Sequence, residues 1–287
     1  MTKGDYLLME NAMFYTEHIT DHITRIVLPG EVFAYLIEGS ERAVLIDTGC
    51  GIGDLKSYVE SLTDKPCVVL LSHGHLDHAP GAVQFEKVFM SIKDHEMAKM
   101  HSDPQIRYGF AVSIDGGKNY TFEDMLPAEE PARYNDLNDG DVFDLGGYTV
   151  EVLACPGHTM GSMTFLMEKE RILLTGDACN PRTLVFGPAA PGLASYERSL
   201  RSLLEKTAGR YDSVLISHGV GQVASRRMVE ENLEIISEIR AGTAENLPFT
   251  FGLGAPDGLL LAKVPDRVNE YGEVMANIAY DSARIEE

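Results

Sequence analysis

The chain has few cysteines, few basic side chains and no long apolar run, and each shortage argues against a class of protein. Its four cysteines are Cys50, Cys67, Cys155 and Cys179, which lie far apart and form no Cys-x-x-Cys pair. This spacing argues against a disulfide framework and against a zinc site built from thiolates. We therefore expect four reduced thiols, most of them buried.

No stretch of the sequence approaches the roughly 18 uninterrupted apolar residues that a membrane-spanning helix needs. The first residues, Met1 to Asp5, lack the basic and then apolar pattern of a signal peptide. We therefore expect a cytoplasmic protein without a membrane partner.

Basic side chains are scarce: 24 Lys and Arg stand against 44 Asp and Glu, which gives a formal net charge of −20. Such a charge repels a phosphate backbone, so we expect no nucleic-acid partner. Ten acidic residues and three basic residues lie between positions 102 and 145. We interpret this run as a solvated face. A small-molecule substrate is the expected partner, and a homodimer is left open.

The chain has 287 residues, of which 44% are hydrophobic, enough to form a well-buried core. Short apolar runs alternate with amphipathic segments, without repeats or a low-complexity linker. Strands are predicted at 25–28, 32–37 and 43–46, and a helix at 54–62. We predict one domain over 1–287, with an insertion of loops and short helices at 102–145 and a hairpin extension at 245–287.

Five apolar runs each end close to a residue that can bind or support a metal ion. The runs lead to Asp47, His73, His158, Asp177 and His218. Rigid strands that deliver polar residues to one edge of a core are a common way to assemble a site. The sequence therefore predicts a metal site at these strand ends.

The densest group of candidate ligands is the sequence His73-Gly74-His75-Leu76-Asp77-His78. Two imidazoles two residues apart on an extended loop can share one ion, whereas Asp77 and His78 point toward a second. A helical pair of histidines would instead be spaced by four residues. Five of the nine histidines fall at the predicted strand ends, which chance does not readily arrange.

Taken together, these motifs resemble those of the metallo-β-lactamase-fold hydrolase superfamily. The His-x-His-x-Asp-His signature follows Leu45-Ile46-Asp47-Thr48-Gly49 and precedes matching motifs at 156–162, 175–177 and 217–219. The matches run in order from about residue 32 to residue 219. The resemblance implies an α/β protein with an αββα four-layer sandwich and metals at one edge of the two sheets.

The resemblance also implies a ligand set, carried over residue by residue. One metal would be held by His73, His75 and His158, a second by Asp77, His78 and His218, and Asp177 would bridge the two. Asp77 and Asp177 would be the catalytic carboxylates. Two zinc ions suit these ligands best, although Fe or Mn also fit. Two such ions can hold a bridging hydroxide as nucleophile, and Asp47 resembles the carboxylate that orients a ligand histidine.

The ligand set leaves several reactions open. Asp177 stands where dedicated β-lactamases carry Cys or Ser, which disfavours antibiotic hydrolysis. We expect a hydrolase resembling glyoxalase II that acts on a small ester, thioester or lactone, with lactonases as the close competitor. The alternatives are a phosphodiesterase and a mononuclear iron oxidoreductase resembling persulfide dioxygenases. The C-terminal tail of this sequence is predicted to be strand-rich, whereas glyoxalase II holds glutathione with a basic helical region. This difference disfavours glutathione as part of the substrate.

Two expectations concern aromatic side chains. We expect aromatic residues of the 102–145 insertion, including Tyr108 and Phe110, to wall the substrate pocket. Tyr196 could reach the metals as a proton donor, but its helical spacing with Leu200 favours a place in the core.

Overall fold

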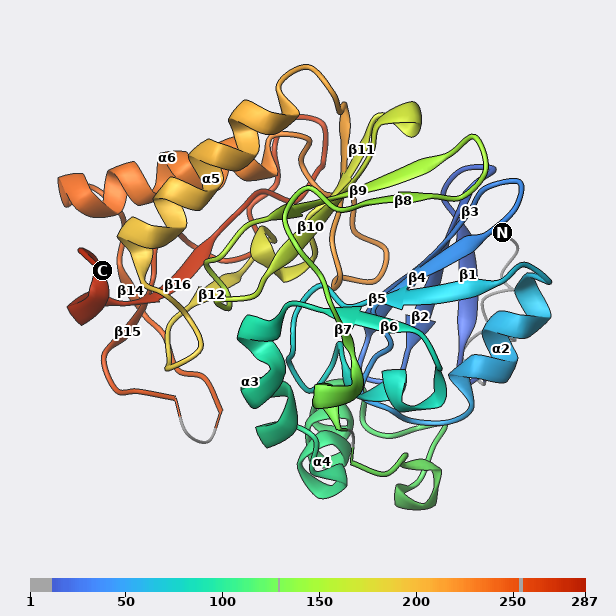
Figure 1. Cartoon of the computed structure of the whole chain (residues 1–287). Coiled ribbons are helices and arrows are strands. Elements are labelled where there is room, and N and C mark those ends of the chain that lie inside the picture. Colours follow the sequence, from blue (N-terminus) through green and yellow to red (C-terminus); the bar gives the residue numbers. More distant parts are fainter. Residues whose placement is uncertain (1–11, 129, 253–254) are drawn as a thin grey trace. The chain divides into compact units, whose positions relative to one another are not determined.

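The computed structural model describes residues 12–128, 130–252 and 255–287 (Figure 1). The chain divides into two compact units, which are described separately below. The first comprises Met1–Leu137, Asp144–Tyr148 and His218–Val220, and the second comprises the remaining residues. Met1 to Asp5, on which the expectation about a signal peptide rests, lie outside the described residues.

The first unit is built on a seven-stranded sheet in the order β1-β2-β3-β4-β5-β6-β7. Its first four strands pair antiparallel, and β4 to β7 pair parallel. The predicted strands in this region, including the hairpin of β3 and β4, are confirmed. The strands are β1 Tyr15–His18, β2 Ile23–Leu28, β3 Val32–Glu38, β4 Ala43–Ile46, β5 Cys67–Leu70, β6 Val88–Met90 and β7 Asn135–Asp136.

Helix α2, at Leu55–Leu62, begins where the sequence predicts a helix. The Asp54 side chain caps it by accepting a hydrogen bond from the backbone N–H of Ser57 at 3.0 Å. Leu55 and Val59 lie one turn apart and pack into a core formed by alternate residues of β2 to β5. The helix therefore covers the face of the sheet that carries this core.

The acidic stretch contains a regular helix as well as loops. Helix α3 covers His95–Met100, and α4 covers Pro104–Asp115 and ends at Gly116. The 3-10 turns of this unit are η1 Pro80–Gln84, η2 Ile92–Asp94, η3 Phe122–Asp124 and η4 Pro131–Arg133. Tyr108 and Phe110 of α4 pack against a small cluster formed by Cys50, Ile52, Ala111 and Tyr120.

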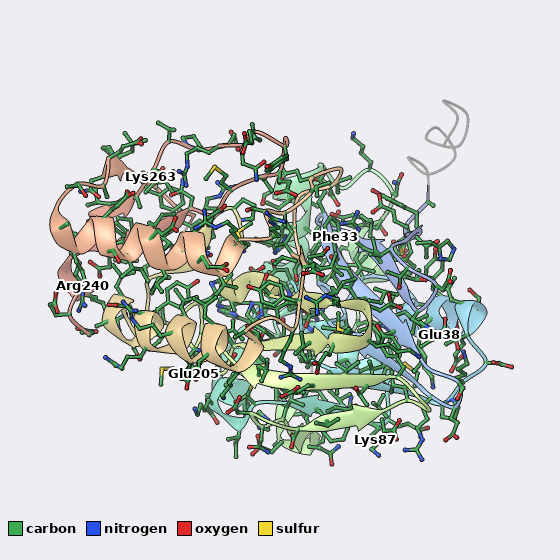
Figure 2. The ribbon with its side chains drawn as sticks, turned by 90° about the horizontal axis from the view of Figure 1, so that it is seen from above. Phe33, Glu38, Lys87, Glu205, Arg240 and Lys263 are labelled. Atoms are coloured by element: carbon green, nitrogen blue, oxygen red, sulfur yellow. The ribbon has the colours of Figure 1, made fainter. Side chains whose placement is uncertain are left out.

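The second unit contains a five-stranded sheet in the order β13-β11-β10-β9-β8. The strands are β8 Val142–Asp144, β9 Thr149–Ala154, β10 Met163–Met167, β11 Ile172–Leu174 and β13 Ser213–Leu215, with 3-10 turns η5 Glu168–Glu170 and η6 Gly176–Ala178. Helices α5 (Leu193–Thr207) and α6 (Met228–Ala241) bury their apolar sides in one core with this sheet. Arg240, labelled in Figure 2, lies in the last turn of α6. It pairs with Glu197 of α5 at 2.8 Å.

A second, four-stranded sheet of this unit has the order β12-β16-β15-β14. Its strands are β12 Thr183–Val185, β14 Leu247–Pro248, β15 Leu259–Leu261 and β16 Ile278–Asp281, followed by the 3-10 turn η7 Ser282–Arg284. Strands β15 and β16, which fall within the 245–287 segment, pair antiparallel. In addition, β16 pairs parallel with β12, so the extension is joined to the region that carries the metal motifs.

Cysteines and hydropathy agree with the expectations from composition. All four cysteines are free thiols, and Cys50, Cys155 and Cys179 are buried. Within the described part of the chain, no helix is both long enough and apolar enough to cross a membrane.

Candidate metal centre

Asp47, directly after β4, organises the histidine-rich loop of the first unit. Its carboxylate accepts hydrogen bonds from the backbone N–H and the hydroxyl of Ser72, both at 2.7 Å, and from Nδ1 of His78 at 2.9 Å. A carboxylate only accepts hydrogen bonds, so Nδ1 of His78 carries the proton and Nε2 is the nitrogen that can ligate an ion. This contact is the one that the orienting role predicted for Asp47 requires.

Ser72 extends this network to the next histidine. Its hydroxyl lies 3.0 Å from Nδ1 of His73, and Nε2 of His73 lies 3.0 Å from Nδ1 of His75. Two nitrogens bound to one tetrahedral zinc ion at ~2.0–2.1 Å lie roughly 3.3 Å apart. The spacing of His73 and His75 is therefore close to that of two ligands of one ion.

A second group of donors surrounds the carboxylate of Asp77. Its Oδ2 atom lies 3.6 Å from Nε2 of His78 and 3.6 Å from Nε2 of His218. Ligand atoms from all three residues lie within 4.8 Å of one another. His218 reaches this place because its backbone forms an isolated antiparallel bridge with Val32, the first residue of β3. The first unit thus brings together five of the seven predicted ligands.

The second unit brings together the other two, His158 and Asp177. Nε2 of His158 lies 3.7 Å from Oδ2 of Asp177. Nδ1 of His158 donates a hydrogen bond to the carbonyl oxygen of Leu184 in β12 at 2.9 Å, which leaves Nε2 as the ligating nitrogen. Asp177 stands in η6, directly after β11, as the pattern of strand ends predicted.

The chemistry of these donors fits a divalent metal. All seven side chains offer imidazole nitrogen or carboxylate oxygen, and this combination suits zinc and related divalent ions. The nitrogen that faces away from the cluster is held by Asp47 in His78, by Ser72 in His73 and by Leu184 in His158. Such outer hydrogen bonds fix the ring and its tautomer, which is typical of histidines that bind metal.

His101, which follows α3, is not among the predicted ligands. Its ring lies 5.2 Å from the ring of His75, at an interplanar angle of 34°. Burial lowers the pKa of His101, although Asp77 and Asp94 act in the opposite direction. Asp94 also accepts a hydrogen bond from the backbone N–H of Gly74 at 3.0 Å. A Cβ at Gly74 would lie 2.8 Å from the Asp94 carbonyl oxygen, so only glycine fits there.

Tyr196 of α5 belongs to the core, as its spacing with Leu200 favoured. The residue is fully buried, and its hydroxyl donates to the carbonyl oxygen of Ala178 at 2.5 Å. The ring packs so closely on Gly157 that a Cβ at that position would lie 2.0 Å from it. Tyr196 therefore supports the turn that precedes His158.

Three of the four thiols, those of Cys50, Cys67 and Cys155, are poor candidates for a catalytic nucleophile. Burial raises the pKa of Cys50 well above its usual value, and burial raises the pKa of Cys67 to about 12. A hydrogen bond with Cys179, together with burial, raises the pKa of Cys155. Thiols in this state are protonated at neutral pH and unreactive.

Comparison with known proteins places these observations in a family. The family model described as Metallo-beta-lactamase superfamily matches residues 27–218. The human acyl-coenzyme A thioesterase MBLAC2 is 26% identical over 206 residues, which cover 64% of this chain and 71% of that protein. An uncharacterized protein of Mycobacterium leprae is 31% identical over 188 residues, which cover 62% of this chain and 80% of that protein.

Solved structures agree with the expected fold class. A metallo-beta-lactamase from Pontibacter korlensis superposes with a TM-score of 0.56 at 18% identity, covering 77% of this chain and 97% of that one. The metallo-beta-lactamase FIM-1 from Pseudomonas aeruginosa superposes with a TM-score of 0.55 at 15% identity, covering 78% and 95%. The mixed α/β chain has the metallo-β-lactamase fold and belongs to the metallo-β-lactamase superfamily.

Proposed function

We propose that this protein is a metal-dependent hydrolase that cleaves a small thioester, ester or lactone at a dinuclear site. One ion would be held by His73, His75 and His158, and the other by Asp77, His78 and His218. Asp177 would be a ligand of both. Zinc is the metal that best suits this set of donors, with Fe or Mn as alternatives.

The observation that carries this proposal is the arrangement of the first unit's donors. His73 and His75 approach each other to 3.0 Å, and Asp77 lies 3.6 Å from both His78 and His218. These are spacings expected of ligands that share an ion. The hydrogen bonds of Asp47 and Ser72 with the outer nitrogens of His78 and His73 hold each ring with its other nitrogen available to an ion.

The reaction would add water to an acyl carbonyl: a thioester and water give a carboxylic acid and a thiol. Two divalent ions, when bound, lower the pKa of a shared water and polarise the carbonyl oxygen. The protein's own task is to hold the ligands rigidly, which Asp47 does for His78 and the Leu184 carbonyl does for His158. The protonated, buried thiols are consistent with water as the nucleophile.

Thioesters are the first substrate class to test. Relatives that are 25–27% identical to this chain over the aligned residues are named acyl-coenzyme A thioesterases in human, cattle and chicken. The net charge of −20 favours substrates that are neutral or carry little negative charge. A thioester resembling the substrate of glyoxalase II and a lactone are the next substrates to test.

The experiment is a turnover panel of thioesters, lactones and phosphodiesters with the zinc-loaded protein, Asp177→Ala and Asp257→Ala. Asp257 is exposed, so its variant controls for the loss of one carboxylate. We expect hydrolysis of at least one carbonyl substrate, a loss of at least ~100-fold in kcat/KM for Asp177→Ala, and no change for Asp257→Ala. Full activity of Asp177→Ala would refute the bridging role. Turnover restricted to phosphodiesters would refute the substrate class.

A further inference from the structure

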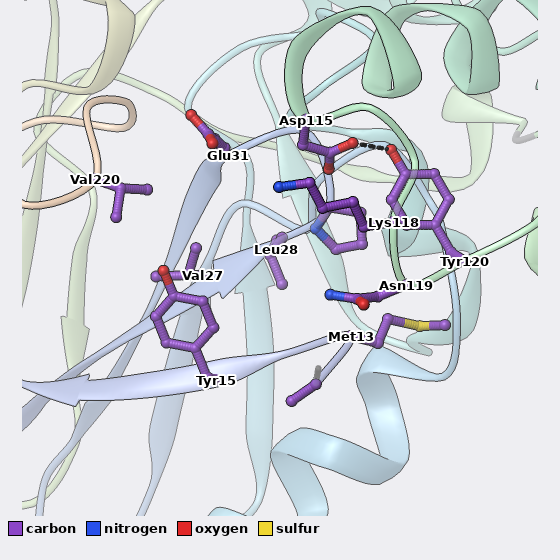
Figure 3. A pocket seen from close by; sticks show the side chains of 12 residues that line it. Met13, Tyr15, Val27, Leu28, Glu31, Asp115, Lys118, Asn119, Tyr120 and Val220 are labelled. Atoms are coloured by element: carbon purple, nitrogen blue, oxygen red, sulfur yellow. Dashed lines mark hydrogen bonds between the residues drawn. The ribbon is translucent and has the colours of Figure 1, made fainter. Parts of the chain in front are cut away.

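The first unit contains a cavity of about 160 Å³ that the metal motifs do not explain (Figure 3). It lies between the β1–β2 strands and the segment that follows α4. One side is apolar and is formed by Met13, Tyr15, Val27, Leu28, Pro29 and Val220. Tyr15 and Val27 are register partners across β1 and β2, so their side chains stand on the same face of the sheet.

Two polar residues of the cavity lining, Asp115 and Tyr120, are engaged in hydrogen bonds of the first unit. The carboxylate of Asp115 accepts from the backbone N–H of Gly30 at 2.6 Å, from that of Gly117 at 2.8 Å and from the hydroxyl of Tyr120 at 2.6 Å. These bonds tie the insertion to the β2–β3 turn. They also leave the apolar side as the main surface that a ligand can bury.

The cavity wall adjoins a candidate metal ligand. Glu31 lines the cavity, and the next residue, Val32, forms the backbone bridge with His218. Val220, on the same wall, is only two residues beyond His218. The backbone segments that carry Glu31 and Val220 are therefore the same segments that position His218.

We propose that this cavity binds the acyl group of the substrate and selects a neutral, short aliphatic chain. The identification of the bound group as the substrate's acyl chain rests on the proposed function. Binding of a neutral aliphatic chain in the cavity does not depend on it. The lining carries the carboxylates of Glu31 and Asp115 and a single ammonium, that of Lys118. This balance disfavours an acyl chain that ends in a carboxylate. Each methylene buried in the cavity should raise affinity about fourfold.

Binding to the cavity can be measured by fluorescence, without turnover. The chain contains no tryptophan, so one introduced tryptophan is the only indole fluorophore. Lys118 is exposed at the rim of the cavity, and Lys118→Trp would place a single fluorophore there (Figure 3). We expect hexanamide to shift its emission to shorter wavelength in a saturable way, and acetamide to bind at least tenfold more weakly. Val142→Trp is the control, because Val142 is 59% exposed in β8 and does not line the cavity.

Filling the cavity should change chain-length selectivity. Val27→Phe and Val220→Phe each place a larger side chain in the lining of the cavity and so reduce its volume. Val220 is 38% exposed, so this position tolerates the larger side chain. We expect each variant to lower kcat/KM for a hexanoyl thioester at least tenfold and for the acetyl thioester less than twofold. Val142→Phe should alter neither value.

The results separate this inference from the proposed function. If no thioester is hydrolysed but hexanamide shifts the emission of Lys118→Trp, the pocket is supported and the proposed thioesterase activity fails. If hexanoyl thioester is hydrolysed, yet Val220→Phe leaves the hexanoyl to acetyl ratio unchanged, the acyl pocket is refuted. The acyl pocket is also refuted if hexanamide does not change the emission of Lys118→Trp.

Discussion

Oδ2 of Asp47 accepts a hydrogen bond from Nδ1 of His78 at 2.9 Å. Asp47 makes this contact from a left-handed backbone conformation, with φ at 62°. A non-glycine residue in that region costs of order 1–3 kcal/mol, and such strain is concentrated at functional sites. The same carboxylate also accepts both hydrogen bonds from Ser72, which contacts His73. One side chain therefore positions a residue from each of the two predicted metal-binding groups.

Asp47→Asn should weaken metal binding about 10–100-fold, as loss of such an outer partner typically does. Asparagine also tolerates the left-handed conformation, so the variant tests the hydrogen bonds and not the backbone. Competition with a chromogenic zinc chelator gives the affinity. Asp64→Asn, at an exposed position after α2, should bind zinc like the wild type. Equal affinities for all three proteins would contradict the role of Asp47.

Arg107 joins the insertion to the loop after Asp47. It is completely buried, and its guanidinium donates to the carbonyl oxygens of Cys50, Ser102 and Leu126 at 2.7–3.0 Å. Arg107→Met would leave these buried acceptors without donors, and we expect it to lower the free energy of unfolding by about 2–4 kcal/mol. Urea unfolding measures the effect. Arg198→Met, at an exposed position of α5, should change it by less than about 0.5 kcal/mol.

The thiol of Cys67 makes stability sensitive to alkaline pH. Burial raises the pKa of Cys67 to about 12, whereas the thiol of an unfolded chain ionises near 8.5. Between these values the unfolded chain has lost a proton that the folded chain keeps, so stability falls as pH rises. One such group contributes a slope of up to about 1.4 kcal/mol per pH unit. Cys67→Val should make the decline between pH 8 and 10 shallower, and parallel curves in urea unfolding would contradict this.

Tyr196 provides a test of the core assignment against a catalytic one. Tyr196→Phe removes the hydrogen bond to Ala178 and should cost about 1 kcal/mol of stability. It should leave kcat within about twofold, since the buried hydroxyl acts on the backbone. Loss of a general acid would instead lower kcat by about 100-fold or more. Thermal unfolding and steady-state kinetics on the same preparation separate the two results.

The sequence predicts what depends on local pattern. The strands at β3 and β4 follow from continuous apolar runs, and α2 follows from the spacing of its apolar residues. The sequence also places His158 and Asp177 after two predicted strands. In the structure the two side chains lie 3.7 Å apart. Their roles as ligands stay a prediction, as does the single domain over 1–287.

Features that depend on distant contacts were not predictable. The ring of His101 lies beside His75 because α3 folds back on the histidine-rich loop, and no periodicity indicates this. The β12–β16 pair joins segments almost a hundred residues apart. Among the aromatic residues of the insertion, Tyr120 lines the cavity, whereas Tyr108 packs beside it in a small cluster. The sequence pattern around a tyrosine does not distinguish a place in the cavity lining from a place in a small apolar cluster.

The most direct test of the account is the metal content per chain of the catalytically active protein. We predict close to two equivalents of zinc, with thioester hydrolysis rising in proportion as the second equivalent is added to metal-stripped protein. One equivalent of iron, together with oxygen consumption during turnover, would contradict the dinuclear hydrolase and favour the oxidoreductase alternative.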